Sequence, residues 1–402
     1  MKFSDLNLEE DLLQAVETMQ YDECTPIQEK TIPIIMSGKD VIGIAQTGTG
    51  KTAAYLLPIL NMLCKEHDEE HINCIIMSPT RELAQQIDRQ LEGFSYFIPV
   101  SGVSVYGGND GILFEQQKKG LTLGADIVIA TPGRLISHLK MDYVDLSHVS
   151  YFIIDEADKM LDMGFYDDIM FIASKLPKDR QTIMFSATMP ERIDLLAKKI
   201  MNAPEEVRLE VSKPAEKIVQ AAYVCYDGQK TELLKYLLKD ETEQRTIIFA
   251  ASKASVKDIT RQLKKNGMNA AEIHSDLEQS ERTNVLTDFK NAKIGILVAT
   301  NIISRGIDID DVKTVINYDV PKECEDYIHR IGRTARANND GLAITLVNEK
   351  DQMQFARIEK FIGKKIYRIP LPDGMEAPVE KVFDLDRKRQ ARKRRAFSKK
   401  KK

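Results

Sequence analysis

Short apolar runs recur along the whole chain, and each ends in a polar or glycine-containing loop that leads into a helix-length segment. In the first half the runs are DVIGIA, INCIIMS, VSVYGG, DIVIATP, YFIIDEAD and TIMFSAT. In the second half they are AAYVCY, TIIFAAS, NAAEIHS, IGILVAT, TVINYDV and GLAITLV. Near-continuous runs rich in Val and Ile are typical of parallel strands buried on both faces. The pattern predicts an α/β fold, in which ligands bind beyond the carboxyl ends of the strands.

The two halves repeat the same order of segments, which indicates two similarly built domains. IIMSPTRELA (75–84) resembles IIFAASKASV (247–256), and IVIATPGR (127–134) resembles ILVATNIISRG (296–306). The length of 402 residues also suits two or three domains of about 150 residues. A polar stretch with two prolines marks a linker between the halves. We predict a first domain, a linker, a second domain and a disordered tail, at residues 1–206, 207–217, 218–369 and 370–402.

The charge of the chain is uneven. Residues 387–402 hold eleven of the 57 Lys and Arg and none of the 61 Asp and Glu. The whole chain has a net charge of −4, so the remainder carries −15. A basic tail on an acidic body is typical of a disordered arm that binds polyanions without reading their sequence, although it could serve solubility alone.

Membrane and secretory features are missing from the sequence. No run approaches the about 20 apolar residues of a membrane span, and the opening MKFSDLNLEE lacks the form of a signal peptide. The five cysteines are scattered, with neither a CxxC pair nor zinc-site spacing. We expect a cytoplasmic protein with reduced thiols and no membrane partner.

The segment AQTGTGKT follows an apolar run and precedes a helix-forming stretch. Small residues in this setting let backbone N–H groups surround phosphates at a helix N-terminus. Lys51 would reach the β- and γ-phosphates of a nucleotide, and the Thr52 hydroxyl would hold Mg²⁺. The general pattern begins with Gly where this chain has Ala45. The predicted phosphate loop is Ala45, Gln46, Thr47, Gly48, Thr49, Gly50, Lys51 and Thr52.

The run YFIIDEAD supplies carboxylates directly after an apolar strand. Asp155 would anchor the Mg²⁺ shell, and Glu156 could orient the attacking water. The alternative is an acidic helix start, where Asp and Glu favour the helix dipole. The phosphate loop upstream favours the nucleotide-site interpretation.

With these residues the chain resembles a DEAD-box RNA helicase, a family named for the four residues found here at 155–158. The resemblance covers roughly residues 1–370. It implies two tandem RecA-like domains with parallel sheets, which face a cleft for ATP and RNA, and it implies ATP and Mg²⁺ as ligands. YDECTPIQ (21–28) resembles the Q motif, in which Tyr21 stacks on adenine, with Phe3 as the upstream aromatic residue.

In the same motif Gln28 hydrogen-bonds the adenine edge and Pro26 belongs to the binding segment. The family usually has Gly where this chain has Gln20. A turn with a buried Tyr is the alternative interpretation of this segment. Three further segments of the first half, SPTRELA, YGG and TPGR, resemble RNA-contacting motifs, although helix starts and turns explain each in isolation. Their candidate RNA-binding residues are Pro79, Thr80, Arg81, Gly107, Gly108, Thr131, Gly133 and Arg134.

SAT (186–188) resembles the motif that links ATP hydrolysis to strand separation, although a cap of the next helix is equally compatible. The resemblance assigns this coupling to Asp158, Ser186, Thr188 and His329. In the second half, ATNIISRGIDI (299–309) resembles the fifth family motif, with Asn301 where the family usually has Asp. The resemblance places Gly306 and Asp308 near the ribose. It assigns RNA contacts to Gln279, Arg282, Thr300, Arg305 and Arg330.

HRIGRTAR (329–336) resembles the sixth motif, with Ala335 where many members have Gly. Arg333 and Arg336 would act as arginine fingers on the γ-phosphate, an effect worth about 10³–10⁵ in rate in related reactions. Because Arg333 is distant from Lys51 in the sequence, this role requires the second domain to close on the first. A solvated helix face is the alternative.

The resemblance implies RNA-stimulated ATP hydrolysis coupled to local, non-processive unwinding of RNA duplexes or remodelling of RNA–protein complexes. Ribosome assembly and mRNA turnover are the processes we expect, with ribosomal or RNA-decay proteins as partners. Two alternatives remain open, an ATP-dependent RNA clamp with little unwinding and a DNA translocase. The oligomeric state cannot be predicted from the sequence.

Overall fold

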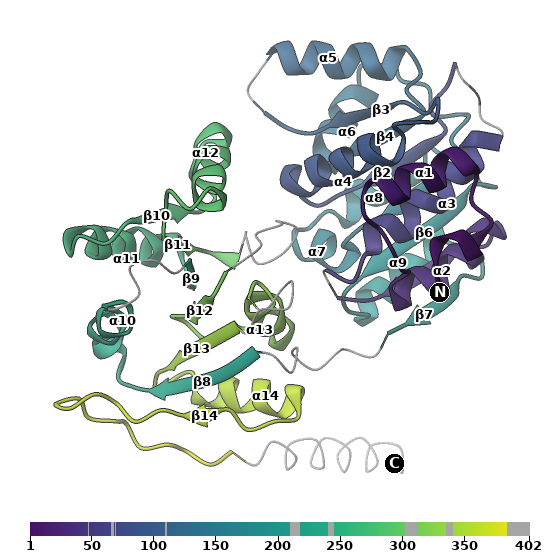
Figure 1. Cartoon of the computed structure of the whole chain (residues 1–402). Coiled ribbons are helices and arrows are strands. Elements are labelled where there is room, and N and C mark those ends of the chain that lie inside the picture. Colours follow the sequence, from purple (N-terminus) through teal and green to yellow (C-terminus); the bar gives the residue numbers. More distant parts are fainter. Residues whose placement is uncertain are drawn as a thin grey trace, which may run out of the picture. The chain divides into compact units, whose positions relative to one another are not determined.

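A computed structural model gives the fold. It describes residues 1–46, 48–65, 68, 70–108, 111–209, 218–239, 245–301, 312–334 and 341–383, apart from the side chains of Gln279 and Glu325. The chain divides into two compact units, Met1–Ser212 and Lys213–Lys402 (Figure 1). Each unit has its own sheet and its own hydrophobic cores.

The first unit is built on a seven-stranded sheet with the order β3-β4-β2-β5-β6-β1-β7, and its neighbouring strands pair in parallel. The strands are β1 (Val41–Ile44), β2 (Cys74–Met77), β3 (Gly102–Val105), β4 (Ile127–Ala130), β5 (Tyr151–Ile154), β6 (Gln181–Ser186) and β7 (Glu205–Arg208). Successive residues of a strand point to opposite faces, so Ile76 lies in one hydrophobic core while Ile75 and Met77 lie in another. The Val/Ile-rich runs are therefore explained by burial on both faces.

Helices cover both faces of this sheet (Figure 1). They are the 3₁₀ turn η1 (Phe3–Leu6) and the helices α1 (Glu10–Thr18), α2 (Pro26–Met36), α3 (Lys51–Lys65), α4 (Arg81–Phe94), α5 (Gly111–Thr122), α6 (Pro132–Leu139), α7 (Ala157–Asp162), α8 (Tyr166–Ala173) and α9 (Glu191–Ile200). The loops that follow β1 to β6 lead into helices, which brings several helix N-termini to the carboxyl edge of the sheet.

The second unit repeats this plan with the parallel order β10-β11-β9-β12-β13-β8-β14. Its strands are β8 (Ile218–Val224), β9 (Thr246–Phe249), β10 (Ala270–Ile273), β11 (Ile296–Ala299), β12 (Thr314–Asn317), β13 (Gly341–Val347) and β14 (Tyr367–Arg368). Its helical elements are η2 (Asp227–Gln229), α10 (Lys230–Leu238), α11 (Lys253–Lys265), α12 (Gln279–Lys290), α13 (Cys324–Ile331) and α14 (Gln352–Ile362). The prediction of two similarly built parallel α/β domains is confirmed.

Two boundaries differ from the prediction. Residues 207 and 208, assigned to the linker, complete β7 beside β1. Residues 370–383, assigned to a disordered tail, lie against the second unit, where Leu371 and Met375 pack on its core. Gln352 holds the same segment through the Val379 carbonyl and the Lys381 N–H, at 3.1 and 2.8 Å. The rest of the linker from residue 210 and of the tail from residue 384 lies outside the described residues.

Among the helices that the structure describes, none is long and apolar enough to cross a membrane.

Candidate active site

The predicted phosphate loop connects β1 to α3, and two of its glycines adopt a left-handed backbone. Gly48 and Gly50 have φ angles of 84° and 85°, which residues with a side chain rarely adopt. The Thr49 hydroxyl donates to the Gln46 carbonyl at 2.7 Å and so closes the turn. Ala45 has no such φ, so Gly is not required at the first position of the loop. Thr47 lies outside the described residues.

Lys51 begins α3 with its side chain pointing into the protein. The residue is only 6% exposed, and its ammonium group makes no hydrogen bond with any residue that the structure describes. A buried cation without a hydrogen-bond partner is costly unless an anion binds it. Beside a glycine-rich loop at a helix N-terminus, this arrangement fits a bound phosphate group.

Asp155 follows β5 and is buried. The Tyr55 hydroxyl and the Glu156 N–H donate to its two oxygens, at 3.0 and 2.8 Å. The pKa of Asp155 is raised to about 6, chiefly by burial and also by the neighbouring Glu156 carboxylate, whereas Lys51 and the hydrogen bonds oppose this rise. A carboxylate that is costly to keep charged in the free protein fits a site for Mg²⁺, whose charge would favour the ionised form.

Glu156 lies next to Asp155 in a left-handed backbone conformation, with φ 50° and ψ 50°. Non-glycine residues in this region cost on the order of 1–3 kcal/mol, and they cluster at functional sites. The conformation holds the buried Glu156 carboxylate beside the Lys159 ammonium, at 3.5 Å. The fold therefore keeps a strained acidic residue beside Asp155.

The Q-motif glutamine contacts the phosphate loop directly. The Gln28 amide donates to the Gly50 carbonyl at 3.0 Å and accepts from the Thr25 N–H at 2.8 Å. A Cβ at position 50 would lie only 2.4 Å from the Gln28 nitrogen, so this close approach requires Gly50. Pro26 occupies the first turn of α2, where its missing N–H costs no hydrogen bond. The predicted adenine-recognition and phosphate-binding segments thus lie together.

Tyr21 packs edge-on against Phe3 and Phe94, with ring centroids 6.1 and 5.3 Å apart, and its hydroxyl accepts from Gln90 at 3.3 Å. The preceding residue, Gln20, has a φ of 60°. The Q-motif loop therefore keeps a glycine-like backbone at position 20 although the residue is Gln. The stacking of Tyr21 on adenine stays a prediction.

The coupling residues of the first unit lie together at the carboxyl end of β6. One oxygen of the buried Asp158 carboxylate accepts from both the N–H and the hydroxyl of Thr188, at 3.0 and 2.9 Å. The Ser186 hydroxyl donates to the Thr188 carbonyl at 2.7 Å, and the Ser186 carbonyl accepts from the Ala45 N–H at 3.0 Å. The predicted coupling motif is therefore bonded to both the DEAD segment and the phosphate loop.

The candidate RNA residues of the first unit converge on the YGG segment. Arg81 donates to the Gly107 carbonyl at 3.4 Å and lies 4.6 Å from the centre of the Tyr106 ring. Arg134 donates to the Gly108 carbonyl at 2.6 Å. Three segments that are distant in the sequence thus form one surface at the carboxyl edge of the sheet.

Two helix N-termini lie in this surface. Thr80 caps α4 and accepts from the Leu83 N–H at 3.3 Å, while Thr131 precedes α6. Pro79, directly before Thr80, is buried. Gly133 is exposed, and a Cβ there would meet no atom within 4 Å. Helix N-termini with exposed small residues suit contacts to a sugar–phosphate backbone.

Arg330, in α13 of the second unit, is buried and makes four hydrogen bonds. Its guanidinium donates to Asn301 Oδ1 at 2.9 and 2.5 Å, to Asn317 Oδ1 at 3.1 Å and to the Asp319 carbonyl at 2.9 Å. Burial lowers the pKa of Arg330 to about 10, and the carboxylates of Asp326 and Asp319 oppose this change. These contacts give Arg330 a structural role in its own unit, and its predicted RNA contact stays untested.

The other second-unit candidates are only partly described. Arg333 is buried, and its Nε donates to the His329 carbonyl at 3.3 Å. Thr300 has a buried hydroxyl with no hydrogen-bond partner among the described residues, and Arg282 lies in α12. Gln279 is described by its backbone alone. Arg305, Gly306, Asp308 and Arg336 lie outside the described residues.

Two residues that position the site were not predicted. Tyr55 holds Asp155, and Asn317 holds Arg330. Tyr55 lies four residues after Lys51 in an otherwise apolar helix, so it shares the face of α3 that carries Lys51. That spacing could have identified it. The sequence around Asn317 at the end of β12 carries no comparable signal.

Comparisons with known proteins agree with this geometry. Residues 25–196 match the DEAD/DEAH box helicase family and residues 229–338 match the helicase conserved C-terminal domain. The chain is 40% identical over 377 residues to the ATP-dependent RNA helicase CshA of Listeria monocytogenes, covering 94% of this chain and 72% of that protein. It is 39% identical over 376 residues to the DEAD-box ATP-dependent RNA helicase CshA of Bacillus subtilis, covering 93% and 75%.

Solved structures show the same pair of domains. Saccharomyces cerevisiae Dbp5 bound to RNA and ADP BeF3 superimposes with a TM-score of 0.82 at 30% identity, covering 92% of this chain and 95% of that chain. Mss116p bound to ssRNA and AMP-PNP gives a TM-score of 0.81 at 32% identity, covering 93% and 80%. The fold is that of tandem RecA-like domains, as predicted. The chain belongs to the DEAD/DEAH box helicase family.

Proposed function

We propose that the protein is an ATP-dependent RNA helicase that uses ATP to unwind short RNA duplexes or remodel RNA–protein complexes. One observation carries the proposal. The buried ammonium of Lys51, which has no hydrogen-bond partner among the described residues, lies in the same unit as Asp155 and Glu156, and the Arg81–Arg134 surface lies at the same edge of the sheet. The relatives that are 39–40% identical to the chain are named ATP-dependent RNA helicases.

Lys51 and the phosphate loop would bind the β- and γ-phosphates of ATP, and Gln28 and Tyr21 would select adenine. Thr52 and Asp155 would hold Mg²⁺, which supplies positive charge to the phosphate oxygens when it is bound. Glu156 would orient the attacking water and accept its proton. The raised pKa of Asp155 supports its assignment as the metal ligand.

The second unit would supply Arg333 and Arg336 to the γ-phosphate. ATP and RNA would then both bind more tightly to the state in which the second unit supplies these arginines. Bound ATP would therefore raise the affinity for RNA, and bound RNA would raise the affinity for ATP. The bonds of Asp158 with Thr188 support a coupling role for these residues, because they join the DEAD segment to a motif that is itself bonded to the phosphate loop. His329, whose carbonyl accepts from Arg333, would share this coupling role.

RNA would be held through its backbone, by the surface around Arg81, Gly107, Gly108 and Arg134 and by Arg282 and Thr300 of the second unit. The basic residues 387–402 would add affinity without sequence preference. Ribosome assembly or mRNA turnover in the cytoplasm, with ribosomal or RNA-decay proteins as partners, stays part of the proposal. The five cysteines, all of them free thiols, support a reducing compartment.

The decisive experiment measures steady-state ATP hydrolysis alone, with single-stranded RNA and with DNA of the same sequence. We expect stimulation by RNA only, and loss of that stimulation in Arg333→Ala. The matched control is Arg357→Ala, an exposed arginine of α14 that contacts Gln354. Equal stimulation by DNA would favour a DNA translocase. RNA stimulation without strand displacement would favour an RNA clamp.

A further inference from the structure

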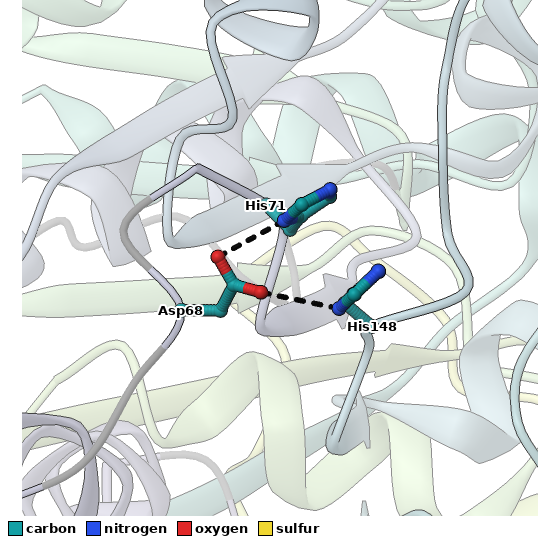
Figure 2. Close-up of side chains that lie close together, drawn as sticks. All are labelled: Asp68, His71 and His148. Carbon is teal, nitrogen blue, oxygen red and sulfur yellow. Dashed lines mark ion pairs between the residues drawn. The ribbon is translucent and has the colours of Figure 1, made fainter.

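Asp68, His71 and His148 form a cluster of metal-ligating side chains away from the candidate active site (Figure 2). Asp68 and His71 belong to the loop before β2, and His148 belongs to the loop before β5. These loops lie at the amino ends of the strands. The phosphate loop, Asp155 and the Arg81–Arg134 surface follow the carboxyl ends, at the opposite edge of the same sheet.

The three side chains converge through a single carboxylate. One oxygen of Asp68 lies 2.9 Å from His71 Nδ1, and the other lies 3.1 Å from His148 Nδ1, as the dashed lines of Figure 2 show. The two imidazole rings are stacked, with centroids 3.8 Å apart and planes 15° from parallel. One donor atom from each residue lies within 4.8 Å of the other two. Both Nδ1 atoms thus face the same carboxylate.

The register of the sheet brings the two histidines together. Cys74, the first residue of β2, pairs with Tyr151, the first residue of β5, and each histidine lies three residues before its strand. The Asn73 carbonyl accepts from the N–H groups of Ser150 and Tyr151, at 2.9 and 3.1 Å. The backbone register therefore places the two histidines at matching positions before neighbouring strands.

Further contacts fix the loop that carries Asp68 and His71. The buried Asn73 amide donates to the carbonyls of Asp68 and His71, at 2.7 and 2.9 Å, and accepts from the Asp68 N–H at 3.1 Å. The loop before β4 packs closely against the loop that carries Asp68 and His71, because a Cβ at Gly124 would lie 2.1 Å from the Glu70 carbonyl oxygen. The ligand positions are held before any ion binds, which reduces the cost of ordering them.

We propose that Asp68, His71 and His148 bind a divalent transition-metal ion such as Zn²⁺, which links the loops before β2 and β5. Two imidazole nitrogens and one carboxylate oxygen suit Zn²⁺ and its neighbours in the first transition series, whereas Mg²⁺ and Ca²⁺ prefer oxygen ligands alone. Three protein ligands and a water form a common open zinc site.

The distances are compatible with this ion. Donor atoms about 2.0–2.1 Å from a tetrahedral Zn²⁺ are about 3.3 Å from one another. The two imidazole nitrogens lie 2.9 and 3.1 Å from different oxygens of Asp68, and one ligand atom of each residue lies within 4.8 Å of the other two, so small side-chain rotations bring three donor atoms to this spacing. The neighbouring Asp145 carboxylate, which accepts from the Ser147 N–H at 2.9 Å, adds negative charge that favours a cation.

The test uses the untagged full-length protein, stripped of metal and titrated with Zn²⁺ alone against a competing chromophoric chelator. The variant is His148→Gln, chosen because this side chain is 45% exposed and its loss should leave the fold intact. Asp68→Asn removes the shared carboxylate. The matched control is Asp179→Asn, an exposed aspartate of the same unit. The cysteines are unchanged in the wild type and in every variant, so any zinc binding by their thiols is the same in each protein.

We expect one zinc ion per chain in the wild type and in Asp179→Asn, and affinity at this site lower by about tenfold or more in His148→Gln and Asp68→Asn. Zn²⁺ should raise the midpoint of thermal unfolding in the wild type and control but not in His148→Gln. Identical zinc binding by wild type and His148→Gln would overturn the proposal. The outcome is independent of the proposed helicase function, because RNA-stimulated ATP hydrolysis is measured without Zn²⁺.

Discussion

Asp158 and Thr188 are joined by two hydrogen bonds that end on the same carboxylate oxygen, at 3.0 Å from the backbone N–H and 2.9 Å from the hydroxyl. Thr188→Val keeps the shape of the side chain and the N–H bond but removes the hydroxyl. A hydrogen bond to a charged group contributes about 1.5–3 kcal/mol, and about 1.4 kcal/mol is a tenfold change in an equilibrium. If this bond links ATP hydrolysis to strand separation, unwinding should fall about tenfold while RNA-stimulated ATP hydrolysis falls much less.

Two assays on the same preparations check this prediction. One measures strand displacement from a short RNA duplex, and the other measures RNA-stimulated ATP hydrolysis. The control is Thr122→Val, which removes an exposed hydroxyl that donates to the Lys118 carbonyl within α5. Parallel loss of both activities in Thr188→Val would show that the bond only supports the nucleotide site.

Gln20 ends α1 in a left-handed conformation, with φ 60°. The Gln20 N–H donates to the Glu17 carbonyl and the Tyr21 N–H to the Val16 carbonyl, which is the Schellman arrangement that usually uses glycine. Gln20→Gly should therefore raise the free energy of unfolding of the first unit by about 0.5–1 kcal/mol. Gln14→Gly, at an exposed position inside α1, should lower it by about 1 kcal/mol.

Urea unfolding followed by circular dichroism measures both changes. Equal destabilisation by the two substitutions would mean that the Gln20 side chain contributes contacts that outweigh its backbone strain.

Asn301 supplies the oxygen that accepts from Nε and Nη2 of the buried Arg330, and its own amide donates to Asp326 at 2.8 Å. Asn301→Ala removes this acceptor from a guanidinium that is buried in the folded protein. We expect a loss of about 2–3 kcal/mol in the stability of the second unit. Asn291→Ala, at an exposed residue after α12, should change stability by less than about 0.5 kcal/mol.

Chemical denaturation of the two variants checks this difference. A near-neutral Asn301→Ala would indicate that Asn317 and the Asp319 carbonyl satisfy the guanidinium by themselves.

The strands were predictable because burial on both faces imposes continuous apolar runs, and each of the twelve runs overlaps a strand of the structure. β7 was missed because it lies at the sheet edge and buries only Val207 among polar residues. β14 was missed because it is two residues long. Local sequence does not record how an edge strand pairs, so the linker was placed too early.

The site was predictable where its chemistry lies within one segment. Lys51 follows its glycines directly, and Asp155 and Glu156 follow their strand. The hydrogen bonds of Arg134 to Gly108, and the meeting of His71 with His148, depend on strand order and register, which no single segment encodes. Asn301 shows a further limit. The sequence shows that it differs from the Asp usual in the family, but not that its amide oxygen still accepts a hydrogen bond from Arg330.

His138 is buried in α6, four residues after Arg134, and stacks on Phe114 with ring centroids 4.3 Å apart. Its Nε2 lies 3.2 Å from the Gln117 amide oxygen, so Nε2 carries the proton and Nδ1 accepts from the Tyr143 hydroxyl. Burial lowers the pKa of His138 from 6.5 to about 4, and the nearby Arg134 contributes. The folded protein thus holds this imidazole neutral.

Because the folded pKa lies below the unfolded value, the unfolded chain binds a proton between pH 6.5 and about 4 that the folded protein does not. The stability of the first unit is therefore complete above pH 6.5 and falls through this window, with a contribution from His138 of at most about 1.4 kcal/mol per pH unit. Carboxylates titrate in the same range, so the difference between wild type and His138→Gln isolates the histidine. Urea unfolding at several pH values should show a shallower decline in His138→Gln, whereas Ser137→Ala, at an exposed position of α6 whose hydroxyl donates to the Gly133 carbonyl, should retain the wild-type slope. Equal slopes in all three proteins would mean that His138 gains a proton without loss of the fold.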